Sequence, residues 1–155
     1  MSHSQIKKVL DLLTHGVYII GVKYRSKING MTAAWVNQVS SQPPMISVAI
    51  SKTHYTSELI SQAKSFSVNI LSSNQMDLAR KCGFSSGRDQ DKLQEEEFMY
   101  QATGAPILRN CAAYLDCELF HQIELGDHIL FIGKVIKANN NHEPVLIYKF
   151  SDFFN

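Results

Sequence analysis

Residue types that bind ligands follow one another closely between Asn29 and Thr56. Small and β-branched residues come first, then a pair of prolines, a short apolar run, and a cluster of hydroxyl groups with one lysine before a predicted helix. A strand with small side chains lets another molecule approach its backbone closely, and the N-terminus of a helix attracts anions. This order predicts a site for a flat polar ligand that ends in a phosphate.

The same residues also have ordinary structural interpretations. Asn29-Gly30 is a common turn signal, and Ser or Thr before a helix is most often a plain N-cap. Trp35 is equally consistent with a core aromatic residue, and Tyr55 with a residue that only closes the start of the helix. His128 follows a predicted tight turn, where a lone histidine is more often a surface residue. Residue types alone leave these alternatives open.

Length and composition narrow the class of protein. With 155 residues, of which 45% are hydrophobic, we expect a single domain over residues 1–155 with a substantial core. The formal net charge is +1 and no long run of Lys or Arg occurs, which argues against a nucleic-acid partner. No segment approaches the roughly 20 apolar residues of a membrane span and no signal peptide is evident, so we expect a cytoplasmic protein without a membrane partner.

Cysteine and histidine positions argue against a metal centre. Cys82, Cys111 and Cys117 form an odd set without a CxxC pair, which predicts neither a disulfide framework nor a zinc site. Cys82 is read as a small buried hydrophobe, with a thiol near the ligand as the alternative. The other histidines show no metal-ligand spacing, and they are His3, His15, His54, His121 and His142. The sequence therefore predicts no metal.

Hydrophobic periodicity predicts the first elements. Apolar residues at helical spacing indicate an amphipathic helix from Ser4 to Leu13, and a continuous apolar run indicates a strand from Val17 to Tyr24 that is covered on both faces. Asn29-Gly30 is expected to turn the chain into a central strand from Met31 to Val39. Pro43-Pro44 should separate that strand from the next one, because proline cannot donate a ladder hydrogen bond.

The rest of the chain reads as mostly β. The predicted elements are a strand from Met45 to Ile50, a short helix around Leu59, Ile60 and Ala63, a strand from Phe66 to Leu71, a helix that stops at Gly83, a polar excursion from Phe84 to Asp91, a solvated helix face at Glu95 to Glu97, two strands from Cys111 to Leu125 and from His128 to Ile136, and a last strand from Val145 to Phe150. Gly126-Asp127 should join the two long strands as a hairpin.

Seven or eight strands with few helices indicate a mostly antiparallel barrel, closed or nearly closed, with peripheral α-helices. No βαβ alternation and no GxGxxG motif occur, so a Rossmann domain is disfavoured.

Four motifs in sequence order resemble the flavin reductase-like family of FMN-binding split barrels. They are the N-G-x-T-A-x-W strand with its P-P-x-x-x-V continuation, the F-x-V-N-x-L strand at Phe66 to Leu71, the G-D-H-x-x-F-x-G-x-V hairpin from Gly126, and the closing segment Pro144 to Tyr148. The pattern from Arg80 to Lys92 is most similar to the flavoredoxin and small flavin reductase branch. The resemblance implies an antiparallel split β-barrel of Greek-key type.

The resemblance also implies a cofactor and a set of site residues. FMN would bind, with FAD as an alternative because its extra adenosine monophosphate could extend into solvent, and NADH or NADPH would be the electron donor. The implied flavin contacts are Asn29, Gly30, Met31, Thr32, Ala33, Ala34, Trp35 and Asn37, and the implied phosphate contacts are Ser51, Lys52 and Thr56, with Tyr55 as a minor candidate. His128 would lie near the nicotinamide or the flavin edge as the catalytic residue. Family members of this fold bind flavin at a dimer interface, so a homodimer is expected.

Three functions fit that resemblance. The first is an NAD(P)H-dependent flavin reductase that passes electrons to free flavin, iron or a partner protein. The second is a flavoredoxin-like FMN electron carrier that another protein reduces. The third, more distant, is a barrel similar to pyridoxamine phosphate oxidase, which usually carries more arginines around its phosphate. A flavin enzyme needs no catalytic dyad, because the protein supplies binding, orientation and electrostatics.

Overall fold

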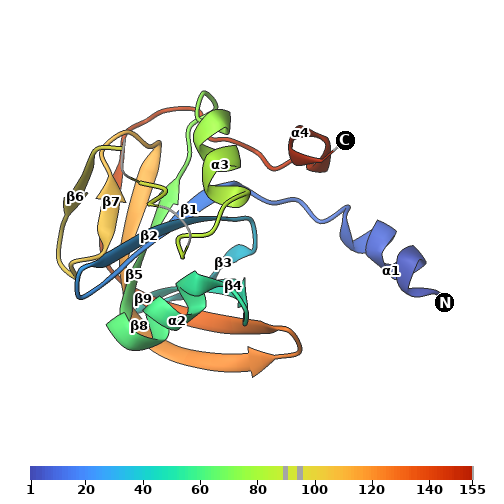
Figure 1. The fold of residues 1–155 in the computed structure, drawn as a ribbon, viewed down its shortest axis with the longest axis horizontal. Helices are drawn as coiled ribbons and strands as arrows, with labels where there is room; N and C mark the ends of the chain where they lie inside the picture. Colours follow the sequence, from blue (N-terminus) through green and yellow to red (C-terminus); the bar gives the residue numbers. More distant parts are fainter. Residues whose placement is uncertain (89–90, 94–95, 155) are drawn as a thin grey trace.

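A computed structural model describes residues 1–88, 91–93 and 96–154 of the chain. In chain order the elements are α1 (His3–Leu10), β1 (Tyr18–Tyr24), β2 (Lys27–Ala33), β3 (Val36–Ser41), β4 (Pro44–Ser51), α2 (Tyr55–Ala63), β5 (Ser65–Ile70), α3 (Met76–Gly83), β6 (Phe98–Tyr100), β7 (Pro106–Leu108), β8 (Ala113–Leu125), β9 (His128–Asn140) and α4 (Phe150–Phe153). Figure 1 shows the strands gathered in one body, with α1 extending away from it.

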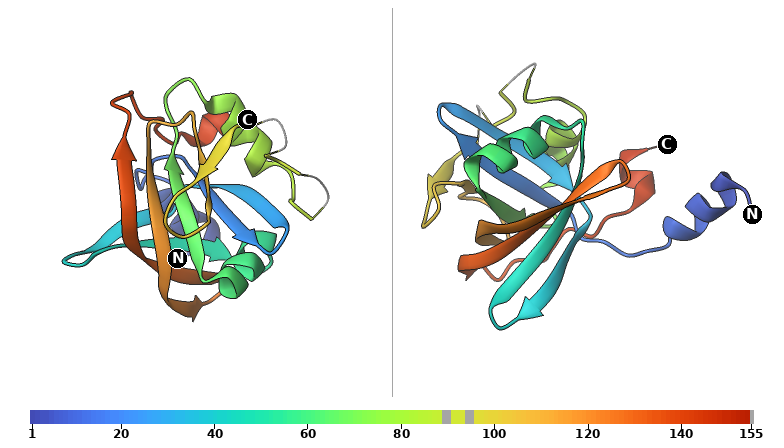
Figure 2. Two further views of the ribbon diagram at one scale, coloured as in Figure 1. Left: turned by 90° about the vertical axis from the view of Figure 1, so that its left-hand side faces the viewer. Right: turned by 90° about the horizontal axis from the view of Figure 1, so that it is seen from below.

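Seven strands form one antiparallel sheet in the order β2-β1-β5-β8-β9-β4-β3, and β6 and β7 form a separate pair. The sheet curls, as the two views of Figure 2 show. Its two edge strands, β2 and β3, do not pair with each other within the described residues, so the barrel is open along one side. This confirms the prediction of a mostly β, antiparallel split barrel with peripheral helices.

Two apolar clusters stabilise this arrangement. The larger one fills the barrel and includes Phe66, Phe131 and Val48, and the second lies beneath α3 and includes Ile19 and Leu71. Burial on both faces of β1 confirms the interpretation of the apolar run there, since successive residues of a strand point to opposite faces of the sheet.

The hairpin predicted at Gly126-Asp127 is confirmed. Leu125 at the end of β8 pairs with His128 at the start of β9, and Gly126 adopts a φ of +54°, which glycine tolerates without a steric penalty. This turn places His128 beside the end of β4, where it pairs with Ser51. Two segments that are far apart in sequence therefore meet at one corner of the barrel.

The prediction of a turn at Asn29-Gly30 is wrong. Both residues are buried inside β2, and the turn lies earlier, where Tyr24 pairs with Lys27. A Cβ atom on Gly30 would collide with the side chains of Leu93 and Ile19, so glycine is needed here for close packing rather than for a turn. A local turn signal cannot distinguish between these two roles.

The predicted central strand from Met31 to Val39 is two strands on opposite edges of the sheet. The chain leaves β2 after Ala33 and re-enters the sheet as β3 at Val36. Between them the Val36 amide donates to the Ala34 carbonyl, and the Ala49 amide of β4 donates to the Trp35 carbonyl. The corner at Ala34-Trp35 is therefore held by one local backbone bond and by one backbone bond to β4, which the sequence pattern does not show.

The chain ends also differ from expectation. The predicted strand from Val145 to Phe150 makes only isolated bridges, Ser72 to Val145 and Gly16 to Ile147, before α4 begins. The opening helix ends at Leu10 rather than Leu13, and none of its residues is buried.

Strands β6 and β7 were not predicted. In the predicted acidic helix, Glu96 and Glu97 lie outside any helix, and Glu95 lies outside the described residues.

Candidate functional site

A small cavity of about 160 Å³ lies where the end of β2, the corner at Ala34-Trp35, the end of β4, the start of β9 and the start of α2 meet. It is lined by Met31, Thr32, Ala33, Ala34, Trp35, Ala49, Ser51, His54 and His128. All of these except Ala49 and His54 were predicted site residues. The tertiary structure thus brings together the small-residue segment, one hydroxyl of the helix entry and the hairpin histidine.

Small side chains form one wall of this cavity. Ala34 and Ala49 line it from neighbouring segments, and the Ala49 amide bonds to the Trp35 carbonyl at 3.1 Å. The Thr32 hydroxyl donates to the Ala79 carbonyl of α3 at 2.5 Å, so that oxygen is already engaged. The wall can therefore offer a ligand close contact with the backbone and methyl groups, but few free side-chain polar atoms.

Trp35 and His128 form an aromatic pair at the rim. Their ring centroids lie 4.8 Å apart with an interplanar angle of 32°, and Trp35 is 51% exposed. The Asp127 carboxylate contacts His128 Nδ1 at 2.6 Å, and this hydrogen bond holds the pKa of Asp127 below its ordinary value. A carboxylate at Nδ1 favours a proton there, which leaves Nε2 available to a ligand.

His54 is a second imidazole in the same cavity, and sequence reasoning missed it because no spacing pattern marked it. It occupies the N-cap position of α2 without a side-chain capping bond. Partial burial lowers the pKa of His54, and the nearby positive charges of Lys92 and His128 lower it further. His54 is therefore neutral at pH 7, since its ordinary pKa of about 6.5 is already below that.

Hydroxyl groups surround the start of α2. Ser51 Oγ lies 3.1 Å from Thr53 Oγ1, and the Ser57 hydroxyl donates to the Ser51 carbonyl at 2.8 Å. Lys52 extends to the surface, where its ammonium lies 3.4 Å from Glu124. Of the residues predicted to bind phosphate, Ser51 lines the cavity, whereas Lys52 is partly neutralised by an acidic neighbour.

Asn29 of β2 and Thr56 of α2 are in contact with each other. The Asn29 amide nitrogen donates to the Thr56 hydroxyl at 2.9 Å, and both residues are buried. Asn29 Oδ1 has no hydrogen-bond partner among the described residues. A Cβ atom on Gly87 would collide with this amide, so the loop after α3 approaches it closely. One polar atom of this buried pair is thus left unsatisfied, which is costly unless a ligand or water completes it.

Lys92 supplies a buried cation on the same side of the molecule. It is only 3% exposed, and its ammonium donates to the Cys82 carbonyl at 3.1 Å. Burial lowers the pKa of Lys92 because the charged form loses solvation, yet its charge still reaches His54. Sequence analysis did not single out this residue, because a lone lysine in a polar loop gives no signal of burial.

The remaining predicted residues lie elsewhere. Gly30 packs against Leu93. The Arg88 guanidinium lies over the Tyr55 ring, with its carbon 4.8 Å from the ring centroid. Cys82 is buried, and burial raises the pKa of its thiol. Asn37 is exposed and lines a different hollow.

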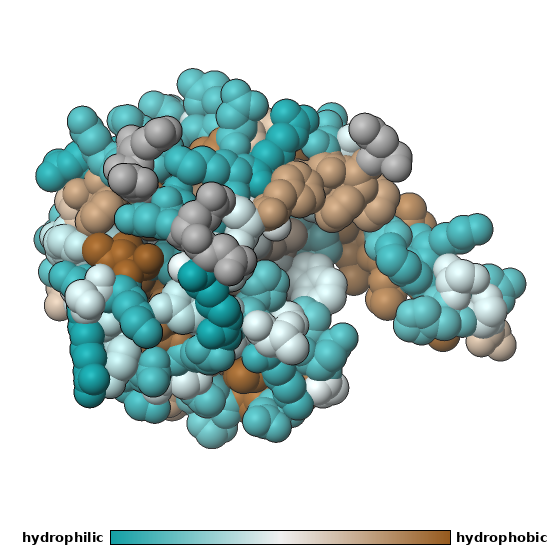
Figure 3. Space-filling model, in the orientation of Figure 1, coloured by the Kyte–Doolittle hydropathy of each residue, from teal (hydrophilic) through white to brown (hydrophobic). Residues whose placement is uncertain are grey.

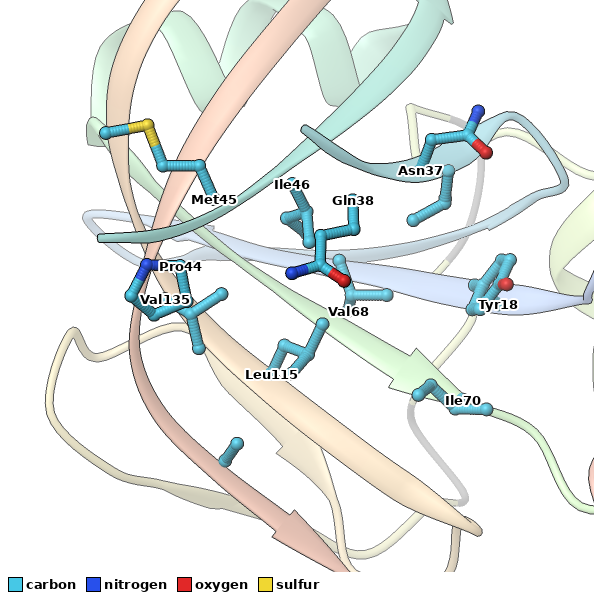
Figure 4. Close-up of a pocket in the computed structure, with 12 residues that line it drawn as sticks. Tyr18, Asn37, Gln38, Pro44, Met45, Ile46, Val68, Ile70, Leu115 and Val135 are labelled. Carbon is cyan, nitrogen blue, oxygen red and sulfur yellow. The ribbon is translucent and has the colours of Figure 1, made fainter. Parts of the chain in front are cut away.

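That hollow, the sheet groove, is an apolar depression of about 480 Å³ on the barrel. It is lined by residues of β1, β3, β4, β5, β8 and β9, which include Tyr18, Asn37, Gln38, Met45, Val68, Ile70, Leu115 and Val135 (Figure 4). Burial raises the pKa of the Tyr18 hydroxyl at its edge. The residues that line the sheet groove include no Lys or Arg, and none of them also lines the cavity at Trp35, so the two hollows are separate.

Within residues 1–88, 91–93 and 96–154, no group of three or more His, Cys, Asp or Glu side chains is arranged to hold a metal ion. Across the same residues, no helix has the length and apolar character that a membrane crossing requires.

An open antiparallel barrel with a small-residue corner beside the start of a helix defines a class of ligand-binding protein. Within that class, the flavin reductase like domain matches residues 10–155 of this chain. The chain therefore belongs to the flavin reductase-like family.

Known proteins support this membership. The chain is 36% identical over 133 residues to the high molecular weight rubredoxin of Moorella thermoacetica, and the match covers 84% of this chain and 58% of that protein. It is 30% identical over 134 residues to the NADH-dependent FMN reductase AsuE2 of Streptomyces nodosus subsp. asukaensis, covering 85% of this chain and 72% of the relative. Among solved structures, flavoredoxin from Methanosarcina acetivorans superimposes with a TM-score of 0.80 and 28% identity, covering 92% of this chain and 78% of that one. The chain thus spans little more than half the length of the rubredoxin relative.

Proposed function

We propose that this protein is an FMN-binding oxidoreductase that takes electrons from NADH or NADPH and passes them to free flavin, iron or a partner protein. The observation that carries the proposal is the convergence of Ala34, Trp35, Ser51 and His128 on one cavity beside an uncapped helix start. Membership of the flavin reductase-like family and the name of the Streptomyces relative support it.

The ring end of the site comprises Met31 to Trp35, Ala49 and His128. Its small side chains suit a flat ring that must approach the backbone, and its main-chain amides can bond ring carbonyl oxygens. When bound, the flavin supplies the hydride and electron chemistry itself. The chain's part at this end is to orient the ring and to exclude water from one of its faces.

The phosphate end comprises Ser51, His54, Thr56, Lys92 and, behind them, Asn29. These residues fit an anion because they combine hydroxyl groups, the N-terminus of α2 and the buried Lys92 ammonium. That ammonium has one protein partner here, the Cys82 carbonyl. Asn29 Oδ1 has no hydrogen-bond partner among the described residues; as an acceptor it would suit a hydroxyl or N–H group of a ligand rather than the phosphate dianion itself. We propose Lys92 rather than Lys52 as the main cation, since Lys52 is exposed and paired with Glu124.

His128 is the proposed catalytic residue at the rim. Its Nδ1 is held by Asp127, so Nε2 is free to bond the carboxamide of a nicotinamide donor that lies over the exposed ring face. Such positioning lowers the barrier by bringing the reacting atoms into line.

The second candidate is a flavoredoxin-like FMN carrier that another protein reduces, and the structural likeness to flavoredoxin favours it. It uses the same site but needs no nicotinamide pocket. FAD remains the alternative cofactor, because the cavity opens to solvent beside Trp35.

We further propose that the protein acts in the cytoplasm as a homodimer of single-domain chains, without nucleic acid. Its net charge of +1 and its family membership support these proposals.

The two candidates separate in a steady-state assay. Oxidation of NADH and NADPH is measured with added FMN, FAD or an iron chelate, alongside an absorbance titration of the protein with FMN. We expect a perturbed flavin spectrum at about one FMN per chain and turnover with at least one nucleotide. FMN binding without nucleotide oxidation would establish the carrier instead, and an unperturbed spectrum at micromolar protein would refute both.

A further inference from the structure

Helix α1 projects from the body on a short connection, as Figures 1 and 2 show, and none of its residues is buried. Ile6 and Leu10 recur at helical spacing, and Leu13 follows just beyond the helix. All three line a cleft of about 720 Å³ between α1 and the body, the α1 cleft. Figure 3 shows hydrophobic side chains gathered in this gap. Ligand pockets typically enclose roughly 300–1,000 Å³, so the α1 cleft can hold a small molecule.

Aromatic side chains form the opposite wall of the α1 cleft. Trp35, Tyr148 and Phe150 line it from the body, and Trp35 also lines the cavity of the functional site. The Tyr148 ring stacks on Phe153 with centroids 5.5 Å apart and an interplanar angle of 22°, which orients it. Aromatic rings on one side of a gap and aliphatic groups on the other suit a flat apolar molecule.

Contacts at two points hold α1 beside this wall. The Tyr148 amide donates to the His15 carbonyl at 2.9 Å, so only residues 11–14 link this anchor to the helix. Within the helix, the Lys7 ammonium lies over the Phe150 ring, 5.2 Å from its centroid. Isolated helices shorter than about 12–15 residues are marginal in water. A molecule in the α1 cleft would therefore stabilise α1 by covering its apolar residues.

Charged groups in the α1 cleft disfavour an anionic ligand. Its lining carries one ammonium, that of Lys7, and two carboxylates, those of Asp11 and Asp127. Lys7 is already paired with Asp11 at 2.8 Å. FMN and carboxylate chelates of iron are anions, and an anion that leaves water for an apolar site needs a cation to pair with. Among electron acceptors, the α1 cleft therefore suits an uncharged one.

Tyr148 supplies a hydrogen-bond donor to such a molecule. Burial raises the pKa of its hydroxyl, and the charge of Asp11 raises it further. The hydroxyl therefore keeps its proton at pH 7, and the effect of Asp11 indicates that it lies near α1. A phenol O–H donates one hydrogen bond, which a carbonyl oxygen can accept.

We propose that the α1 cleft binds a quinone, an uncharged planar ring with carbonyl oxygens, as the electron acceptor of this protein. The ring lies between the aromatic wall and Leu10, and one carbonyl oxygen accepts from Tyr148. Because Trp35 borders both hollows, the quinone is held beside the ring end of the flavin site.

The net reaction balances without a further reactant. NADH or NADPH gives up a hydride, the solvent gives a proton, and the quinone takes both, with the two electrons of the hydride, to become the hydroquinone. The acceptor role therefore rests on the proposed function, whereas binding of a quinone by the chain alone does not.

Trp35 is the only tryptophan of the chain, so its fluorescence reports on the α1 cleft. Menadione, a bicyclic quinone, is titrated into the full chain without flavin, and the buried cysteines limit its addition to thiols. We expect saturable quenching by menadione and at least 10-fold weaker binding of the anionic 1,4-naphthoquinone-2-sulfonate. Quenching that never saturates, or equal affinity for the two quinones, would overturn the proposal.

Tyr148→Phe tests the contact with the carbonyl oxygen, because it keeps the stacked ring and removes only the donor. One hydrogen bond is worth about 0.5–1.5 kcal/mol, so menadione should bind roughly 2- to 10-fold more weakly. The affinity for 2-methylnaphthalene, which has the same skeleton without carbonyl groups, should stay the same. Equal effects on both probes would show that the cleft does not recognise a quinone.

Charge substitution tests the part of α1. Leu10→Asp with Leu13→Asp adds two carboxylates to the cleft and should weaken menadione at least 10-fold, whereas Lys8→Asp, at a residue outside the cleft lining, should leave it unchanged. Because α1 contributes no buried residue, circular dichroism of the sheet should be the same in all variants. If the double variant binds menadione normally but sediments differently from wild type, a second chain rather than a quinone occupies the cleft.

Failure of this inference and failure of the proposed function give different results. Nucleotide oxidation with FMN or a ferric chelate, in a protein without saturable menadione binding, refutes the quinone site and leaves the function standing. Menadione binding that responds to the variants as expected, in a chain that binds no flavin, refutes the function and leaves the quinone site. When both hold, the double variant should raise the KM for menadione at least 10-fold without changing the KM for the nucleotide; an unchanged KM for menadione would refute the acceptor role.

Discussion

The proposed ring end and the proposed phosphate end of the site differ in how far the chain satisfies its own polar groups. At the ring end the Trp35 side chain is half-exposed and small residues leave space. At the proposed phosphate end Thr56 and Lys92 are buried and already hold one partner each, and Asn29 Oδ1, an acceptor, has no partner within residues 1–88, 91–93 and 96–154. A flat ring needs room and contact, whereas a phosphate dianion needs donors that are already desolvated and oriented.

Substitutions at the two ends should therefore discriminate differently between FMN and riboflavin, which lacks the phosphate. The largest effect is expected for Lys92→Met, which keeps the length of the buried side chain but removes its charge. Charge-assisted bonds are worth roughly 1.5–3 kcal/mol, so FMN should bind roughly 10- to 150-fold more weakly while riboflavin is little affected. Fluorescence titration with both ligands measures this difference.

Lys52→Met is the matched control for that prediction. Its ammonium is exposed and paired with Glu124, and an exposed pair contributes at most about 1 kcal/mol. If Lys52→Met weakens FMN binding more than Lys92→Met does, Lys52 rather than Lys92 is the main cation for the phosphate.

Ala34→Leu should act at the ring end and affect both ligands alike. The larger side chain would fill the space that the ring needs, at a cost of roughly 1–3 kcal/mol. Titration with FMN and with riboflavin should show parallel losses, and Ala102→Leu, at an exposed position away from the cavity, should show none. A loss confined to FMN would mean that the phosphate lies at this corner and the two ends are interchanged.

His128→Ala should slow hydride transfer about 10-fold, which corresponds to roughly 1.4 kcal/mol of transition-state positioning, and should alter FMN affinity less. Stopped-flow reduction by NADH or NADPH gives the rate, and an FMN titration gives the affinity. An unchanged hydride step with collapsed FMN binding would make His128 part of the flavin pocket rather than a residue that positions the donor.

The smallest expected effect concerns pH and His54. Because its pKa is lowered in the folded chain, the unfolded chain binds more protons at this residue as the pH falls below about 6.5. The free energy of unfolding should therefore decrease on acidification. Between pH 7.5 and 5.5 this decrease should be smaller in His54→Asn than in wild type. Urea unfolding at the two pH values measures this, with His121→Asn as an exposed control; equal losses in His54→Asn and wild type would contradict it.

Sequence patterns predicted most of the strands because the positions that a strand buries are apolar and recur at regular spacing along the chain. The apolar run of β1 and the glycine turn before His128 are examples, since each depends on residues close together in the chain. The same local reasoning failed at Asn29-Gly30, where the glycine is required by the distant side chain of Leu93.

The residue types alone determined a mostly β chain, a small-residue segment at Ala34, and a hydroxyl-rich helix start after Ser51. Only the tertiary structure decided that Ala34 lies at a corner between two edge strands, that His54 shares a cavity with His128, and that Lys92 is a buried cation. The physical reason is that turns, caps and alternation arise from neighbouring residues. Burial of a single charge and the meeting of two imidazoles depend on how segments far apart in the chain pack against one another.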